Sequence, residues 1–198
     1  MIDKETFCIP IYKKKVINSE KILQLYREKC DNLVEENDEG WGYDWAGFCG
    51  SWNSNFLTYN ILTESSIFKD LINPIVDCTQ EYLQELKMPP EYTVRLDHSW
   101  LNATSEYGFQ EYHRHAPYTI SGCIYFSSPR EYGNFYFKNP FEYELHDELD
   151  IFKPHRVLDL EAGDILLFPS NLKHGVAQNP KNKKRYSLCF NFNHILKE

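Results

Sequence analysis

The amino-acid sequence predicts a mainly β fold, a sandwich or jelly-roll barrel, with helices from the first part of the chain covering one face. From Tyr92 onward, seven or eight short runs rich in β-branched and aromatic residues follow one another, separated by turn signals. Aromatic residues make up 16% of the chain, which suits a β-rich core or a lined pocket. Helical patterns come first and strand patterns afterwards, which argues against a parallel α/β sheet.

Helices are predicted in the first third of the chain. Ser19 is the expected N-cap of a helix over about residues 20–36. A second helix is predicted over about residues 64–87, bent or divided at Pro74 and ended by Pro89 and Pro90. The first helix has an apolar face at helical spacing that we expect to pack on the core; it consists of Ile22, Leu25, Tyr26, Cys30 and Leu33.

Two stretches of this first part are predicted to be non-helical. Phe7 to Tyr12 resembles a short edge strand, because Pro10 interrupts its hydrogen-bonding ladder. Residues 38–60 are rich in Gly, Trp and Asn and are predicted to form a long surface loop. The loop carries three Trp residues within twelve positions, which could shape a substrate entrance or simply pack.

The chain is expected to form a single domain over residues 1–198. Its 198 residues are enough for one domain with a real core and too few to suggest two independent ones. Within this domain, residues 1–90 are predicted to provide helical support and the loop, and residues 91–198 the jelly-roll core.

Charge and composition exclude several classes of protein. A formal net charge of −8 and short basic runs argue against sequence-independent binding of nucleic acid, which needs a basic face. No window holds 18 apolar residues, and the first residues lack the apolar core of a signal peptide, so we expect no membrane association. The six cysteines form no Cys-x-x-Cys pair. We therefore expect reduced, mostly buried thiols in a cytoplasmic protein.

Three of the seven histidines have positions that suggest a metal site. His113 and His115 form a His-x-His pair before a predicted strand, and His174 opens a later strand. Side chains of residues two apart in a strand point to the same face, so this pair can bind one ion. Two neighbouring histidines and a distant one leave the opposite face of an octahedral metal open, as in reactive iron sites. A structural zinc site would close its shell with four ligands, and no fourth is obvious here.

Arg185, eleven residues after His174, is a candidate carboxylate clamp. Its guanidinium offers a planar fork that pairs bidentately with a carboxylate. Ser187 lies two positions further along the same predicted strand and would point into the same cavity. An arginine inside a barrel would need an anionic partner. The alternative is that Arg185 is a surface residue at the end of the basic run KNKKR.

Two stretches of the chain resemble the 2-oxoglutarate/Fe(II) oxygenase superfamily. SWLNATSEYGFQEYHRHAPYTISGCIYF is similar to a pattern of Trp-x-Asn, Gly, His-x-His and Ser-Gly before an aromatic strand. LEAGDILLFPSNLKHGVAQNPKNKKRYSLCFNFN is similar to Gly-Asp, an apolar strand, Phe-Pro-Ser, His, and finally Arg-x-Ser. Together they cover about residues 99–193, and they look most like the small oxygenases of cyanobacteria and cyanophages.

The resemblance implies a double-stranded β-helix, a jelly-roll and cupin-like barrel with iron at one mouth. His113 and His174 match the metal-binding histidines of the family. Arg185 matches the residue that binds the distal carboxylate of 2-oxoglutarate, and Ser187 completes the Arg-x-Ser pair. Two further cosubstrate contacts are implied by position, Tyr125 at the end of the Ser-Gly strand and Asn102 on the strand before the metal motif.

The sequence departs from the family at one metal ligand. The superfamily usually has His-x-Asp or His-x-Glu, whereas His115 stands at the carboxylate position. An imidazole is neutral, so the iron site would carry one more positive charge, although three histidines still bind Fe(II). Glu111, two residues before His113, is the alternative third ligand.

The expected function is that of a 2-oxoglutarate- and Fe(II)-dependent dioxygenase, a hydroxylase. Its partners would be 2-oxoglutarate, O₂ and a substrate that the sequence does not identify, with a protein side chain such as prolyl favoured over a small molecule. Four aromatic residues are candidates for the pocket lining or the core: Tyr118, Tyr125, Phe135 and Phe137. The alternatives are a cupin-like metal-binding module and a cupin enzyme that does not use 2-oxoglutarate. The metal-binding module would keep the three histidines but would not require Arg185 inside the barrel.

Overall fold

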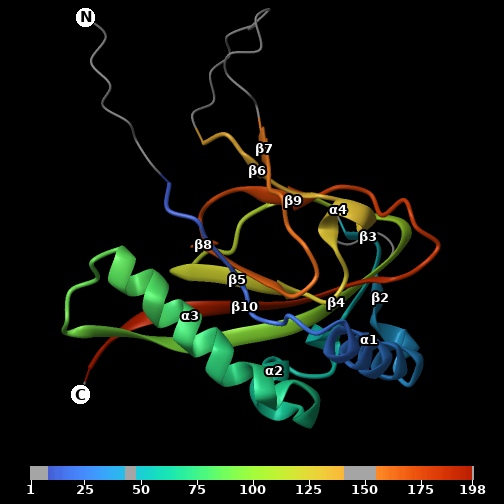
Figure 1. Cartoon of the computed structure of the whole chain (residues 1–198), viewed down its shortest axis with the longest axis horizontal. Helices are drawn as coiled ribbons and strands as arrows, with labels where there is room; N and C mark the ends of the chain where they lie inside the picture. Colours follow the sequence, from blue (N-terminus) through green and yellow to red (C-terminus); the bar gives the residue numbers. More distant parts are fainter. Residues whose placement is uncertain (1–8, 43–47, 141–154, 198) are drawn as a thin grey trace, which may run out of the picture.

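The computed structural model describes residues 9–42, 48–140 and 155–197, in which an antiparallel sheet curls into a half-barrel with helices against its outer face (Figure 1). The strands are β1 Tyr12–Lys15, β2 Trp41–Gly42, β3 Phe48–Asn53, β4 Tyr92–His113, β5 Ile120–Tyr125, β6 Phe135–Lys138, β7 His155–Val157, β8 Asp164–Pro169, β9 His174–Val176 and β10 Arg185–Leu196. The helices are α1 Glu20–Glu35, α2 Ile61–Glu64, α3 Ile72–Glu85 and α4 Pro129–Tyr132, with 3-10 turns η1 Asp38–Gly40, η2 Ser54–Phe56 and η3 Ser66–Leu71. The predicted mainly β fold, a double-stranded β-helix buttressed by helices, is confirmed.

The long strand β4 joins the two layers of the half-barrel. The main path of the sheet runs β1-β8-β5-β10-β4-β9-β6-β7, and every pairing between described strands is antiparallel. The first half of β4 pairs with β10 in the larger layer, and its last residues pair with β9 in the smaller one (Figure 1). Gln110 and His113 are three positions apart, so in a regular strand their side chains would point to opposite faces. The register shift between them lets both side chains reach the interior.

Alternating side chains of the larger layer serve two different cores. On β10, Tyr186, Leu188 and Phe190 belong to the apolar cluster shared with the helices. On the opposite face, Arg185, Ser187 and Cys189 line the interior of the half-barrel. The same alternation holds on β5, where Ile124 faces the helices and Tyr125 the interior. This period of two places polar side chains inside the barrel while the outer face is covered by helices.

The first helix begins where the sequence predicts, and its buried face agrees with the predicted one only in part, at Tyr26 and Cys30. Ser19 caps α1, with its hydroxyl accepting a hydrogen bond from the amide of Ile22. The buried residues of α1 are Leu23, Tyr26, Cys30 and Val34. Ile22 and Leu25, which were expected on the core face, are 47% and 49% exposed. Apolar residues occupy more than one face of this helix, so their spacing alone did not identify the face that is buried.

The second predicted helix is broken before Pro74 rather than at it. The segment contains α2, η3 and α3, and Pro74 lies in the first turn of α3. A proline is tolerated there because the first amide groups of a helix have no intrahelical acceptor. α3 ends at Glu85, ahead of Pro89 and Pro90.

Residues 38–60 are not the surface loop that was predicted. They contain η1, β2, β3 and η2, and β3 pairs with β4 along the interior. Trp52 is fully buried and Trp41 lines a cleft, whereas Trp45 lies outside the described residues. The predicted edge strand at Phe7–Tyr12 is also displaced: β1 starts at Tyr12, pairs with β8 alone, and residues 1–8 lie outside the described ranges.

Four cysteines in the described ranges are free thiols. Cys30, Cys78 and Cys123 are buried, and Cys189 is half-buried beside the interior cavity. This agrees with the expectation of reduced, mostly buried thiols. Separately, none of the described helices has both the length and the apolar character that crossing a bilayer requires.

Candidate metal centre and cosubstrate cavity

Three histidines from distant parts of the chain meet at the mouth of the half-barrel. His113 ends β4, His115 follows it, and His174 opens β9, where it pairs directly with His113. One potential ligand atom from each ring lies within 4.8 Å of the other two. In the described part of the chain, these histidines are the one group of metal-ligating side chains that lie close enough together to hold an ion. The exposed side chain of Glu111, the alternative ligand, is not part of it.

Each of the three rings is oriented by a hydrogen bond at Nδ1. The Nδ1 atom of His113 lies 2.9 Å from the carbonyl oxygen of Glu111, and that of His174 lies 2.8 Å from the carbonyl of Leu172. A backbone carbonyl only accepts, so these Nδ1 atoms carry the proton and the lone pair lies on Nε2. The Nδ1 atom of His115 lies 3.0 Å from Oδ1 of Asn191. Hydrogen bonds of this kind fix the tautomer and the ring orientation of histidines that bind metals.

Burial keeps the three imidazoles neutral. Desolvation lowers the pKa of His113 and, together with the other two histidines, holds the pKa of His174 well below its usual range. The same loss of solvent, with a smaller contribution from His113, lowers the pKa of His115 to about 4. Neutral imidazole is the form that binds a metal.

These shifts make the metal-free protein sensitive to acid. The folded-state pKa of His115 lies below the unfolded value of about 6.5, so the unfolded chain binds more protons in that interval. Stability is therefore complete above about pH 6.5 and is lost as the pH falls toward 4, by on the order of 3 kcal/mol from this residue. Urea unfolding in EDTA at pH 7.5 and 5 measures the part of this loss that occurs above pH 5, on the order of 2 kcal/mol. The variant His115→Gln should show a smaller difference between the two pH values, and an equal difference would contradict the assignment.

Arg185 lies inside the half-barrel at the other end of the same cavity. It is 4% exposed, and desolvation lowers the pKa of its guanidinium to about 10, so it remains charged at neutral pH. Its Nη1 donates to the carbonyl oxygens of Tyr132 at 2.8 Å and Ala177 at 3.1 Å, and its Nη2 donates to Oγ1 of Thr104 at 3.2 Å. None of the described carboxylates forms a salt bridge with it.

The turn that holds Arg185 depends on Gly133. This glycine has a φ of +106°, and a Cβ atom on it would come within 2.7 Å of Nη1 of Arg185 and 2.3 Å of the carbonyl oxygen of Ala177. No side chain fits there, because both neighbours belong to the bonded guanidinium site. The turn after α4 therefore positions the arginine from outside its own strand.

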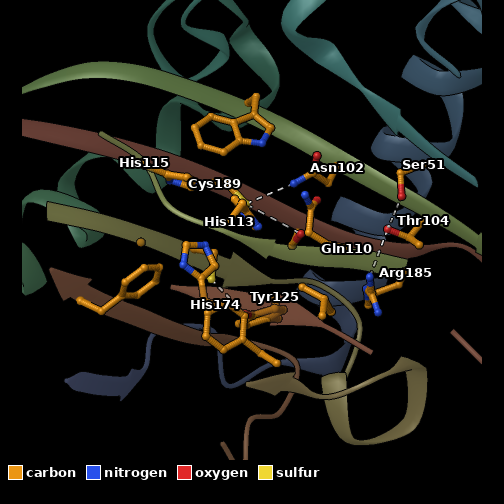
Figure 2. Close-up of a pocket in the computed structure, with 17 residues that line it drawn as sticks. Ser51, Asn102, Thr104, Gln110, His113, His115, Tyr125, His174, Arg185 and Cys189 are labelled. Carbon is orange, nitrogen blue, oxygen red and sulfur yellow. Dashed lines mark hydrogen bonds between the residues drawn. The ribbon is translucent and has the colours of Figure 1, made fainter. Parts of the chain in front are cut away.

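A continuous cavity connects the histidines with Arg185, and strand register builds its walls (Figure 2). Ser187 on β10 lies opposite Asn102 on β4 and Tyr125 on β5, so the three form one row across three strands. Arg185 lies opposite Thr104 in the next row. The cavity is thus lined by all the residues that the sequence predicted for the cosubstrate: Asn102, Tyr125, Arg185 and Ser187.

Two of these side chains have protein partners inside the cavity. Asn102 accepts a hydrogen bond from Nδ2 of Asn53 at 2.9 Å and donates to Sγ of Cys189 at 3.4 Å. The hydroxyl of Tyr125 accepts from Sγ of Cys123 at 3.0 Å, which leaves its own proton available for an acceptor in the cavity. Burial raises the pKa of Tyr125 well above its usual value, so the phenol stays protonated.

A wider cleft opens beside the histidines. It has a volume of about 520 Å³ and shares Ser51, Trp100, His113 and His115 with the inner cavity. The ring of His98 stacks between Tyr59 and Trp100, with centroids 4.3 Å and 4.6 Å away. Among the described residues that line the cleft, Glu39 is the one with a charged side chain. The cleft therefore offers aromatic and neutral polar surface next to the candidate metal centre.

The donor set fits a divalent metal together with a dicarboxylate. The three neutral imidazoles lie within reach of one ion, as an open facial site requires. The buried guanidinium of Arg185 has hydrogen bonds but no described carboxylate partner, and a buried charge of this kind calls for an anion. A jelly-roll barrel with these two features defines a metal-dependent enzyme that takes an anionic cosubstrate.

Comparisons with known proteins point to one family. The model of a family described as "Putative 2OG-Fe(II) oxygenase" matches residues 98–191, which include all of the predicted site residues. The match covers just under half of the chain and indicates a 2-oxoglutarate-dependent oxygenase of the non-haem iron class, as the sequence predicted. No curated protein matches the chain by sequence.

Several solved structures share the fold at low sequence identity. A prolyl-4-hydroxylase of Pseudomonas putida is 13% identical, with a TM-score of 0.61, over 93% of this chain and 92% of that one. HygX of Streptomyces hygroscopicus, solved with nickel, 2-oxoglutarate and hygromycin B, is 14% identical with a TM-score of 0.58, covering 93% and 83%. A Trichoplax adhaerens prolyl hydroxylase bound to a peptide fragment of hypoxia inducible factor is 10% identical with a TM-score of 0.62, covering 92% and 83%.

Sequence reasoning missed the residues that support the site. Thr104 bonds Arg185, Ser121 and Asn191 bond His115, and Gln110 lines the cavity. Strand alternation from Arg185 and Ser187 would have identified Asn191 as inward-facing. Of the remaining histidines, His98 and His194 are hydrogen-bonded and His155 is exposed, whereas His146 lies outside the described residues.

Proposed function

We propose that this protein is a hydroxylase that holds Fe(II) with His113, His115 and His174 and binds 2-oxoglutarate through Arg185. The observation that carries the proposal is a buried guanidinium that shares one cavity with three converging imidazoles. A metal site alone would not need the arginine, and a structural arginine would be expected to have a protein carboxylate.

The metal and its cosubstrate supply the activation of O₂ and the oxidation of a C–H bond, while the chain supplies orientation and exclusion of water. Arg185 binds the distal carboxylate of the cosubstrate with the guanidinium edge that its carbonyl contacts leave open. Ser187 and Tyr125 lie in the adjacent row and donate hydroxyl hydrogen bonds to the same end. Asn102, held by Asn53, presents its amide to the cosubstrate or the substrate.

His115 is the proposed third metal ligand in place of a carboxylate. Its Nδ1 atom is engaged by Asn191, so its Nε2 atom is the one available to a metal. The Glu111 side chain is exposed, while the backbone carbonyl of the same residue orients His113. Glu111 therefore supports the metal site through its main chain instead of its carboxylate.

The substrate is proposed to be a protein side chain, with a prolyl ring favoured. The cleft next to the histidines is open and lined by aromatic and neutral polar groups, including Trp41, Phe56 and Trp100. Aromatic faces suit an apolar ring, and an open groove suits a segment of chain. The peptide-bound prolyl hydroxylase shares the fold. An acidic protein with few basic residues in this cleft is poorly suited to nucleic acid. We propose the cytoplasm as its location, given the free thiols.

The test is the absorption of the complex formed without oxygen. Fe(II) is added to the purified protein under anaerobic conditions, followed by 2-oxoglutarate. We expect a visible charge-transfer band only when metal, cosubstrate and protein are all present. Bovine serum albumin with the same additions is the control for free chelate. Metal binding without such a band would instead support the cupin-like module or a cupin enzyme that does not use 2-oxoglutarate.

A further inference from the structure

Gln110 is a buried polar residue of the cavity whose amide nitrogen has no hydrogen-bond partner. The residue is 7% exposed, and its Nε2 atom is the one buried side-chain nitrogen or oxygen in the described ranges that lacks a partner. It lines the same cavity as the three histidines and Arg185. Other polar side chains of this wall are bonded: Ser51 donates to Thr104, and Thr104 accepts from Arg185.

An unsatisfied buried donor that faces a cavity indicates that the cavity binds an acceptor. Taking an amide N–H out of water without a new acceptor is unfavourable, so folded proteins rarely keep one. Leucine would fill the position without that cost, since Val176, opposite Gln110, and Phe135, on the same cavity wall, are apolar. The retained amide is therefore explained if the donor is satisfied when the cavity is filled.

The position of Gln110 points to the acceptor. The residue lies on β4 three positions before His113, opposite Val176 of β9, two positions after His174. Figure 2 shows its side chain between the histidines and Arg185. The distal carboxylate of 2-oxoglutarate already has Arg185, Ser187 and Tyr125 in the proposed function, and the middle of the molecule is methylene. The remaining acceptors are the oxygens at its metal-side end.

We propose that Gln110 is a further cosubstrate-binding residue, whose amide N–H donates a hydrogen bond to the metal-side carboxylate of 2-oxoglutarate. This inference rests on the proposed function. It gives the cosubstrate a neutral donor at one end and a cation at the other, so that orientation in the cavity is specified from both ends.

The test compares Gln110→Leu with the wild-type protein in two measurements. In the first, 2-oxoglutarate is titrated calorimetrically into protein loaded with Mn(II), a stand-in for Fe(II) that does not oxidise. We expect the affinity for 2-oxoglutarate to fall roughly 10-fold or more, the effect of losing a hydrogen bond to a charged group, while the affinity for Mn(II) changes less than about twofold. In the second, thermal unfolding of the ligand-free protein should occur at a higher temperature in the variant, because the orphaned donor is gone.

The pair of results separates a binding role from a structural one. A residue that only supports packing would lower the unfolding temperature when replaced and would leave binding unchanged. Gln84→Leu, on the exposed side of α3, controls for the substitution itself. Gln110→Glu keeps the size and places a negative charge toward the carboxylate, so it should weaken binding more than the leucine variant does. If Gln110→Leu does not fold, this second variant provides the test.

The outcomes also separate this inference from the one it rests on. Affinity for 2-oxoglutarate that is unchanged within twofold in both Gln110 variants overturns the role of Gln110 and leaves the proposed function intact. Failure of the metal-loaded wild-type protein to bind 2-oxoglutarate overturns both.

Discussion

Replacing His174 with alanine should abolish succinate production while the protein remains folded. His174 is 3% exposed and supplies one of the three imidazoles, so two ligands would remain. Removing a residue that only orients a metal ligand typically lowers metal affinity about 10- to 100-fold. Loss of the ligand itself should lower the affinity for Fe(II) by at least as much. The measurements are Mn(II) binding by calorimetry and succinate formation under air with excess Fe(II).

The fold should survive this substitution because the aromatic neighbours of His174 also pack against each other. Its ring packs against Phe135 and Phe168, with centroids 5.3 Å and 4.7 Å away, and these residues also contact one another. Circular dichroism and the unfolding midpoint provide the check. His155→Ala, at an exposed position on β7, is the matched control and should keep wild-type turnover. Succinate formation by a folded His174→Ala protein would remove this residue from the metal.

Strand periodicity made the interior of the barrel predictable. A period of two assigns Arg185 and Ser187 to one face of β10, and an inward arginine needs an anion, so both the position and the chemistry follow from sequence. The convergence of His113 with His174 is a property of sheet register, which the spacing of 61 positions does not reveal. There the resemblance to a family supplied what local patterns lacked.

The errors lie where tertiary contacts override local signals. Residues 38–60 have the composition of a loop, yet β3 forms there because it pairs with β4 between Asn102 and Gln110. Ile22 and Leu25 have helical spacing, but α1 turns Leu23 and Val34 to the core instead. Gln110 carried no signal, since its significance is the absence of a partner within a folded cavity.

The three-histidine set changes the electrostatics of the site in a way that the cosubstrate can offset. A carboxylate ligand would neutralise one charge of Fe(II), whereas His115 is neutral. Together with Arg185, the cavity would then present three positive charges when metal is bound. 2-Oxoglutarate is a dianion, so it neutralises most of this charge. We infer that binding of the metal and binding of the cosubstrate reinforce one another, because each brings the charge that the other lacks.

Replacing Arg185 with alanine should therefore remove cosubstrate binding and leave metal binding largely intact. A buried guanidinium pairing with a carboxylate accounts for about 3–5 kcal/mol when one partner is lost, which corresponds to a fall in 2-oxoglutarate affinity of more than about 100-fold. The carbonyl oxygens of Tyr132 and Ala177 also lose their donor, so the unfolding midpoint should fall. The anaerobic charge-transfer band, followed as 2-oxoglutarate is increased, measures the effect directly.

Arg185→Lys separates charge from geometry in the same assay. Lysine keeps the positive charge but lacks the planar fork that reaches Tyr132, Ala177 and Thr104 together. The affinity of the Arg185→Lys protein for 2-oxoglutarate should therefore lie between those of the wild type and the alanine variant. Arg130→Ala, at an exposed ion pair with Asp159, is the matched control and should bind normally. A charge-transfer band in Arg185→Ala that saturates at the wild-type concentration of 2-oxoglutarate would show that the buried cation serves the fold alone, and the carboxylate would then have to bind elsewhere in the cavity.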